Sequence, residues 1–258
     1  MERERLIFHI DVNSAFLSWE SVDRLKKDPT ALDLRTIPSA VGGDASKRHG
    51  IVLAKSTPAK RYGVTTGEPL AQALKKCPHL MVVPSHFEIY VASSRRLLKL
   101  LEEYTPDIEK FSIDEAFLDM TETIHLFGEP LAVADGIRRR VREELGFTVN
   151  VGISSNKLLA KMASDFEKPD RTHTLFPAEI PEKMWPLPIR ELFLVGGAAQ
   201  KKLESLGLHT IGELAHSDPE LLALHLGGKY ARLIHDYANG LDSEPGGEGT
   251  AMDKGYGN

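Results

Sequence analysis

FSIDEAFL, residues Phe111–Leu118, places two adjacent carboxylates, Asp114 and Glu115, inside an otherwise apolar run that is typical of a β-strand. Burying a charged side chain is costly unless a cation lies beside it. Another apolar run, Leu6–Ile10, ends at a third carboxylate, Asp11. If the two strands lie side by side, the three carboxylates converge, and such a cluster can hold divalent magnesium for phosphoryl or nucleotidyl transfer.

The length and composition are ordinary for a globular protein. The chain has 258 residues, 41% of them hydrophobic and 27% charged, which suits one large domain or two to three small ones. No apolar run approaches the ~18 residues of a membrane span, and the N-terminus lacks the apolar core of a secretion signal. We therefore expect a cytoplasmic protein without membrane contact. The single cysteine, Cys77, excludes an internal disulfide and a cysteine-rich zinc site.

The formal net charge of -5 hides a strong asymmetry along the chain. Between Arg35 and Lys76 there are eight basic residues against Asp44 and Glu68, whereas residues 102–122 hold eight acidic residues against one lysine. Most of these charges are explained well enough as solvated surface. The asymmetry also allows one segment to face phosphates while the other gathers metal ions.

The order of expected elements predicts an α+β fold. We expect single strands over residues 6–12, 81–83 and 147–153, a small hairpin over 38–54 and a strand pair over 107–120. We expect helices over residues 14–25, 70–76, 87–104 and 130–145, of which 87–104 is the long one. Strand, long helix, strand pair, helix and strand predict a ferredoxin-like sheet backed by two helices. Residues 35–77 are then an insertion into that sheet.

The C-terminal third has a different character. Prolines punctuate a small helical region, within which Leu194–Gly197 followed by Lys201–Leu208 is typical of a helix-hairpin-helix. Backbone amides at Gly196 and Gly197, with Lys201 and Lys202 beside them, would face a phosphate. The glycine-rich end, residues 244–258, is typical of a linker.

Three longer motifs resemble one family. HIDVNSAF at His9–Phe16, SIDEAF at Ser112–Phe117 and NKLLAKMASD at Asn156–Asp165 are similar, in this order, to the Y-family (translesion) DNA polymerases, which include DinB and UmuC. The resemblance covers about residues 6 to 240. It implies a palm at residues 1–13 and 78–168, fingers at 14–77, a helical thumb at 169–240, and a linker at 241–258 toward an absent little-finger domain.

The resemblance also implies an activity and its partners. Members of this family add deoxynucleotides to a primer 3'-hydroxyl opposite damaged or undamaged template, with low fidelity. The expected partners are therefore primer-template DNA, deoxynucleoside triphosphates and two Mg²⁺ ions, with a sliding clamp bound through a region outside this chain. We expect a monomer.

Site residues are carried over by position in these motifs. The metal ligands and catalytic carboxylates are Asp11, Asp114 and Glu115, with the Val12 carbonyl as a further metal ligand. Phe16 is the steric gate that excludes ribonucleotides. The expected contacts to the incoming nucleotide are Asn13, Ser14, Ala15, Phe16, Thr57, Lys60 and Lys157. The expected DNA contacts are Gly196, Gly197, Lys201 and Lys202.

The sequence departs from the family pattern at several positions. Thr57 and Lys60 stand where DinB-type members have a tyrosine and an arginine, and lysine lacks the bidentate fork of arginine. UmuC-like members also carry lysine there, so the subfamily stays open. Leu194 replaces a hairpin glycine, which predicts a displaced or strained hairpin. Asn13 replaces a common aspartate that is not usually a ligand. We expect chemistry to be intact and the hold on DNA to be weak.

Two alternatives remain at this stage. One is a catalytically weak or inactive core fragment that acts as a DNA-binding or partner-binding module. The other is a nucleotidyl cyclase, since VGGDA at Val41–Ala45 partly matches the Gly-Gly-Asp-Glu-Phe signature of those enzymes. It lacks the Glu and the Phe, so we interpret it as a turn.

Overall fold

The computed structural model describes residues 4–43 and 50–242. The chain forms two compact units, residues 1–176 and 177–258, and each is described by itself. The cyclase-like Asp44 and residues 243–258 of the expected linker lie outside the described residues. Among the described residues, none of the helices is both long and apolar enough to cross a membrane.

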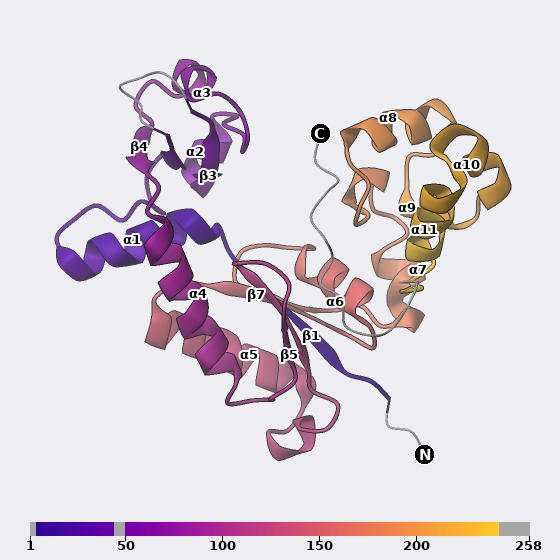
Figure 1. Ribbon diagram of the computed structural model, residues 1–258, viewed down its shortest axis with the longest axis horizontal. Coiled ribbons are helices and arrows are strands. Elements are labelled where there is room, and N and C mark those ends of the chain that lie inside the picture. The colour runs from indigo at the N-terminus through magenta and orange to yellow at the C-terminus, as the bar shows by residue number, and fades with distance from the viewer. Residues whose placement is uncertain (1–3, 44–49, 243–258) are drawn as a thin grey trace. The chain divides into compact units, whose positions relative to one another are not determined.

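A five-stranded sheet forms the centre of the first unit (Figure 1). Its order is β5-β6-β1-β7-β8, in which β7 and β8 are parallel and the other neighbours are antiparallel. The strands are β1 (Ile7–Val12), β5 (Ile108–Lys110), β6 (Glu115–Asp119), β7 (Val149–Ser154) and β8 (Thr172–Thr174). The prediction of a mixed α+β fold is confirmed.

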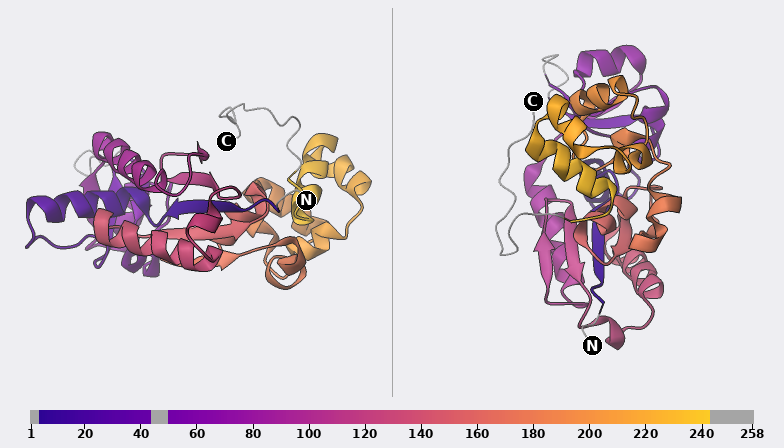
Figure 2. Two further views of the ribbon diagram at one scale, coloured as in Figure 1. Left: turned by 90° about the horizontal axis from the view of Figure 1, so that it is seen from below. Right: turned by 90° about the vertical axis from the view of Figure 1, so that its right-hand side faces the viewer.

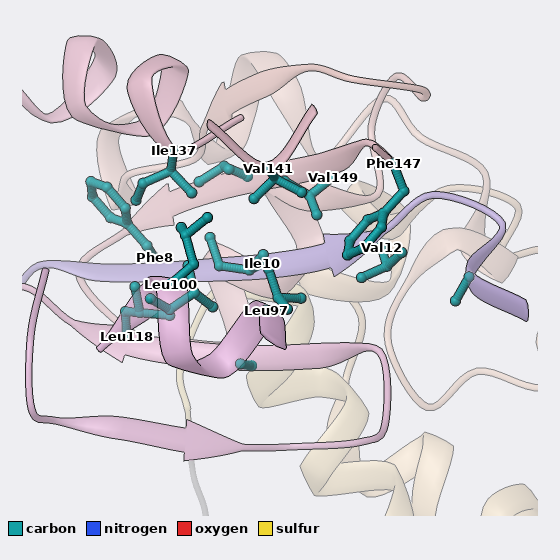
Figure 3. Close-up of a cluster of buried hydrophobic side chains, with 14 of the residues drawn as sticks. Phe8, Ile10, Val12, Leu97, Leu100, Leu118, Ile137, Val141, Phe147 and Val149 are labelled. Atoms are coloured by element: carbon teal, nitrogen blue, oxygen red, sulfur yellow. The ribbon is translucent and has the colours of Figure 1, made fainter. Parts of the chain in front are cut away.

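Side-chain alternation along β1 gives the sheet two different faces. Phe8, Ile10 and Val12 enter the main core together with residues of α4 (Phe87–Leu101) and α5 (Pro130–Arg140), as Figure 3 shows. Ile7 instead clusters with Phe117 and with Ala160 of α6 (Lys157–Ser164). Asp11, one residue before the end of β1, therefore lies on the face that α6 covers, opposite the apolar core.

Gly152 allows α6 to lie directly on β7. A Cβ atom at this position would fall within 2.5 Å of the Ser164 backbone nitrogen and still closer to the Ala160 carbonyl oxygen. Only a residue without a side chain permits this approach. The close packing in turn brings the lysines of α6 over the strand ends that carry the carboxylates.

The insertion forms a small sheet of its own. Its strands, β2 (Ser39–Gly42), β3 (Val52–Lys55) and β4 (Met81–Pro84), run in the order β3-β2-β4. The expected hairpin is confirmed, because β2 and β3 are antiparallel. Helices α2 (Thr57–Arg61) and α3 (Leu70–Lys76) complete this region, and α1 (Ala15–Lys27) leads into it. Cys77 is buried in the insertion's small core.

Several boundaries differ from those expected. β4 pairs with β2, so the sheet of the insertion continues past residue 77, where the palm was expected to resume. The helix predicted over residues 130–145 is α-helical only to Arg140 and continues as a π-helical turn, η3 (Val141–Leu145). β8 pairs with β7, so the first unit extends to Phe176, past the boundary predicted after Lys168. A three-residue strand is too short to show the periodicity by which strands are predicted.

Helices build the described part of the second unit (Figure 2). They are α7 (Ile180–Lys183), α8 (Gly197–Ser205), α9 (Ile211–Ala215), α10 (Pro219–Leu226) and α11 (Gly228–Ala238), with short turns η4 (Pro177–Glu179) and η5 (Ile189–Glu191). Another such turn, η2 (Ile124–Leu126), precedes α5 in the first unit. Thr210 and Glu213 form a capping box that starts α9.

Candidate active site

The two apolar runs pair with each other at the end of the sheet where their carboxylates lie. Asp11 lies directly opposite Glu115 in the antiparallel pair of β1 and β6. The Val12 backbone N–H donates to the Asp114 carbonyl oxygen at 3.0 Å, which extends this pairing to the neighbouring carboxylate. The expectation that the two strands lie side by side is therefore confirmed.

Lysines compensate the charges of two carboxylates. Lys161 on α6 contacts Glu115, with 2.6 Å between Nζ and Oε1. Lys168 contacts Asp11 and also Asp165, with 2.8 Å to the Asp165 carboxylate. In the acidic doublet, the Lys161 ammonium meets Glu115, whereas Asp114 accepts a hydrogen bond from the Ser112 hydroxyl at 2.7 Å.

Burial shapes the protonation of this pair of ions. Desolvation raises the pKa of Asp11 to about 6, although the positive charge of Lys168 acts in the opposite direction. Burial alone would lower the pKa of Lys168, but the carboxylates of Asp11 and Asp165 outweigh it and raise that pKa. A cation at Asp11 therefore favours the ionised carboxylate, the form that binds metal ions.

The donor chemistry fits magnesium. Asp11, Asp114, Glu115 and the Val12 carbonyl offer hard oxygen ligands, which magnesium prefers. Across residues 4–43 and 50–242, no three acidic, histidine or cysteine side chains are grouped to hold one ion, and Asp11 and Glu115 each hold a lysine. An ion bound by these carboxylates would compete with the ammonium groups for the same oxygens.

The start of α1 leaves backbone donors close to this cluster. Ser14 is the N-cap residue, has a left-handed backbone with φ 46°, and makes no side-chain capping bond. The first turn of α1 contains no acidic residue. Since uncapped amides and the helix dipole both favour anions, the backbone at Ser14, Ala15 and Phe16 suits a phosphate group.

Phe16 is held by an aromatic and polar network. Its ring stacks on Tyr90 of α4, with centroids 4.5 Å apart and an interplanar angle of 12°. The Tyr90 hydroxyl donates to the buried Glu20 carboxylate at 2.6 Å, and the His86 backbone N–H donates to the same oxygen at 2.9 Å. The ring expected to serve as the steric gate thus rests on a fixed support.

The other predicted nucleotide contacts lie in three places. Asn13 directs its amide toward Thr148, Asn150 and Asp170 of the same unit. Thr57 and Lys60 lie on α2 of the insertion, where Lys60 is exposed. Burial and the charge of Lys60 lower the pKa of nearby Lys55. Lys157 pairs with Glu109 of β5.

Sequence reasoning did not assign roles to Lys161 and Lys168. Lys161 follows Lys157 by four residues, so both lie on one face of α6, and this spacing could have identified it. No local pattern marks Lys168, because its contact with Asp11 joins residues that are distant in sequence.

The hairpin of the second unit has the expected glycines at the start of α8. Gly196 is the N-cap residue and Gly197 begins the helix, and a Cβ at either position would meet nothing within 4 Å. Lys201 and Lys202 are exposed on this helix. Leu194 has a φ of 69°, which costs a residue with a side chain roughly 1–2 kcal/mol. The strain expected at this position is therefore present.

Comparisons with known proteins agree on the family. The family profile described as impB/mucB/samB matches residues 10–165, and the helix-hairpin-helix profile of the same family matches residues 177–208. DNA polymerase IV of Clostridium acetobutylicum is 51% identical over 239 residues, which are 93% of this chain and 60% of that protein. DNA polymerase IV 1 of Bacillus subtilis is 42% identical over 94% of this chain and 56% of its own length.

Solved structures give the same fold. The DinB structure from Sulfolobus solfataricus superposes with a TM-score of 0.81 at 27% identity, over 93% of this chain and 68% of that one. A chimeric Y-family DNA polymerase superposes with a TM-score of 0.80 at 27% identity, over 93% of this chain and 69% of its own. The chain thus spans a little over half the length of the curated relatives quoted above. It belongs to the impB/mucB/samB family, which is the Y-family DNA polymerase IV type.

Proposed function

We propose that this chain is the catalytic core of a DNA-directed DNA polymerase of the translesion type. The observation that carries the proposal is the register of β1 and β6, which sets Asp11 opposite Glu115 where the chain turns into α1. The strand order and the two backing helices support a ferredoxin-like palm. The insertion corresponds to fingers, and the second unit to a thumb.

The side chains at this end of the sheet would divide the work of nucleotidyl transfer. Asp11, the Val12 carbonyl, Asp114 and Glu115 would hold two Mg²⁺ ions, which when bound activate the primer 3'-hydroxyl and stabilise the charge on the leaving pyrophosphate. The uncapped amides of α1 and the ammonium groups of Lys168 and Lys60 would bind the triphosphate. In the second unit, the amides at Gly196 and Gly197 with Lys201 and Lys202 would bind a DNA phosphate.

The insertion suits a tolerant polymerase. Its core consists of small and medium side chains such as Ala40, Val52, Val64 and Leu70. A region of this size can check the shape of a new base pair only weakly, which lowers fidelity and permits damaged templates. The proposed partners are primer-template DNA and deoxynucleoside triphosphates, with the protein acting in the cytoplasm as a monomer.

Phe16→Ala is expected to admit ribonucleotides. The ring, fixed by its stack on Tyr90, would meet the one extra oxygen of a ribose, and discrimination against one additional group in a shaped pocket is worth about 10- to 200-fold. The ratio of kcat/KM for deoxynucleotide over ribonucleotide should fall by that amount. Unchanged discrimination, with deoxynucleotide incorporation retained, would place the gate elsewhere.

Lys168→Ala and Lys157→Ala form a matched pair for the triphosphate contact. Lys168 contacts Asp11, whereas Lys157 contacts Glu109. We therefore expect Lys168→Ala to raise the KM for deoxynucleotide about tenfold, which corresponds to the loss of one charge-assisted hydrogen bond to the triphosphate. Lys157→Ala should have a smaller effect. The opposite ranking in single-nucleotide incorporation would assign the triphosphate to Lys157, as its motif position implies.

Primer extension tests the function as a whole. The chain should incorporate deoxynucleotides with magnesium on an undamaged template and opposite an abasic site, and Asp114→Ala should abolish both reactions. Equal, zero incorporation by both proteins would contradict the polymerase proposal. If the inactive chain still bound primer-template DNA, that result would favour a non-catalytic DNA-binding core. The nucleotidyl cyclase alternative has no support, because the chain belongs to a different family.

A further inference from the structure

Two buried asparagines, Asn13 and Asn150, lie beside the carboxylate cluster. Asn150 is opposite Asp11 in the pairing of β1 with β7, on the other side of Asp11 from Glu115. Asn13 follows the end of β1. Asn150 is fully buried and Asn13 is 7% exposed. Buried amides are costly unless their donors and acceptors are satisfied, so their partners indicate what they stabilise.

The partners lie in one segment, residues 164–171. Asn150 Nδ2 donates to the carbonyl oxygens of Ser164 at 3.0 Å and Glu167 at 2.7 Å, and its Oδ1 accepts from the Arg171 backbone N–H at 3.2 Å. The Asp170 backbone N–H donates to Asn13 Oδ1 at 2.9 Å. Each backbone partner can act in only one sense, which fixes the orientation of both amides.

The two amides also bond to each other. Asn13 Nδ2 donates to Asn150 Oδ1 at 3.1 Å, and Asn13 Oδ1 accepts from the Thr148 hydroxyl at 2.9 Å. The segment that they hold contains an unfavourable backbone conformation. Asp170 has a φ of 58°, which residues with a side chain rarely adopt. Arg138 and Arg142 bind the Asp170 carboxylate at 3.1 and 2.6 Å and hold the same turn.

This segment carries Lys168 to Asp11. We propose that Asn13 and Asn150 are positioning residues, which fix the backbone of residues 164–171 so that the Lys168 ammonium stays at the carboxylate cluster, where it can pass from Asp11 to a triphosphate. The inference rests on the proposed function for its consequence in catalysis. The placement of Lys168 itself can be measured without it.

The first experiment measures placement. Lysine reactivity toward acetic anhydride, quantified by mass spectrometry on the folded protein, should show a ratio of Lys168 to Lys157 labelling that rises several-fold in Asn13→Ala and Asn150→Asp. Asn150→Asp retains the acceptor for Arg171 but removes both donors. Val151→Ala is the matched control, since Val151 is buried on the opposite face of β7. It should leave the ratio unchanged. If Asn150→Asp does not fold, Asn13→Ala alone decides.

The second experiment is a double-mutant cycle in single-nucleotide incorporation. Asn13→Ala should raise the KM for deoxynucleotide about fivefold with kcat changed less than about twofold, and should add almost nothing in a Lys168→Ala background. Equal effects in both backgrounds, or an unchanged labelling ratio in a folded variant, would overturn the positioning role. If the chain does not polymerise, a raised labelling ratio still supports the placement, and only the catalytic consequence fails with the proposed function.

Discussion

Asp11→Asn is expected to reduce deoxynucleotide incorporation by about 10³-fold or more. A carboxylate that holds a catalytic metal contributes several kcal/mol of transition-state stabilisation, and each 1.36 kcal/mol changes the rate tenfold. Fold stability should change little, because Lys168 keeps its second partner, Asp165, at 2.8 Å. The measurement is kcat for single-nucleotide incorporation, with thermal unfolding of the same preparation.

Asp107→Asn is the matched control for that variant. Asp107 is an exposed carboxylate just before β5, in the same acidic region of the chain. Its replacement should leave incorporation unchanged. Full activity of Asp11→Asn would contradict the assignment of the site, and an equal loss in Asp107→Asn would attribute the effect to overall charge. Glu115 is a less suitable test, because its removal also breaks the ion pair with the buried Lys161 ammonium and would lower stability as well as activity.

Gly152→Ala is expected to destabilise the first unit by about 3 kcal/mol or more. The added methyl group meets backbone atoms of Ala160 and Ser164, which cannot turn aside as a side chain can. Overpacking typically costs about 1–3 kcal/mol, and backbone obstacles place this variant at the upper end or beyond. In thermal unfolding, a loss of this size should lower Tm by roughly 6–12 °C.

Gly136→Ala separates the contact from the chemistry of the substitution. Gly136 lies in α5, and a Cβ there would meet nothing within 4 Å. Since alanine is the better helix former, this variant should be more stable by roughly 0.5–1 kcal/mol. An unaltered Tm for Gly152→Ala would show that α6 does not need its close approach to β7.

The predictions succeeded where local patterns dominate. The apolar runs Leu6–Ile10 and Phe111–Leu118 identified β1 and β6, and helical spacing identified α4 and most of α5. They were less accurate where a segment depends on a distant partner. β8 is three residues long and exists only because β7 pairs with it.

The same division holds at the site. The acidic doublet in an apolar run was visible in the sequence, and so was the need for a cation. Which cations meet these carboxylates was not visible, since Lys161 lies 46 positions from Glu115 and Lys168 lies 157 positions from Asp11 in the chain. The inward direction of the Asn13 amide was equally hidden, because its partners belong to β7 and to the turn at Asp170.

The sequence by itself determined most strands and helices, the family resemblance and the candidate carboxylates. Apolar runs, the helical spacing of apolar residues and short motifs can each be recognised from neighbouring residues alone. Only the tertiary structure decided which charges touch. Strand register set Asp11 between Glu115 and Asn150, and the close approach at Gly152 brought α6 with Lys161 onto the same face of the sheet. Those contacts depend on packing between segments far apart in sequence, which no local pattern encodes.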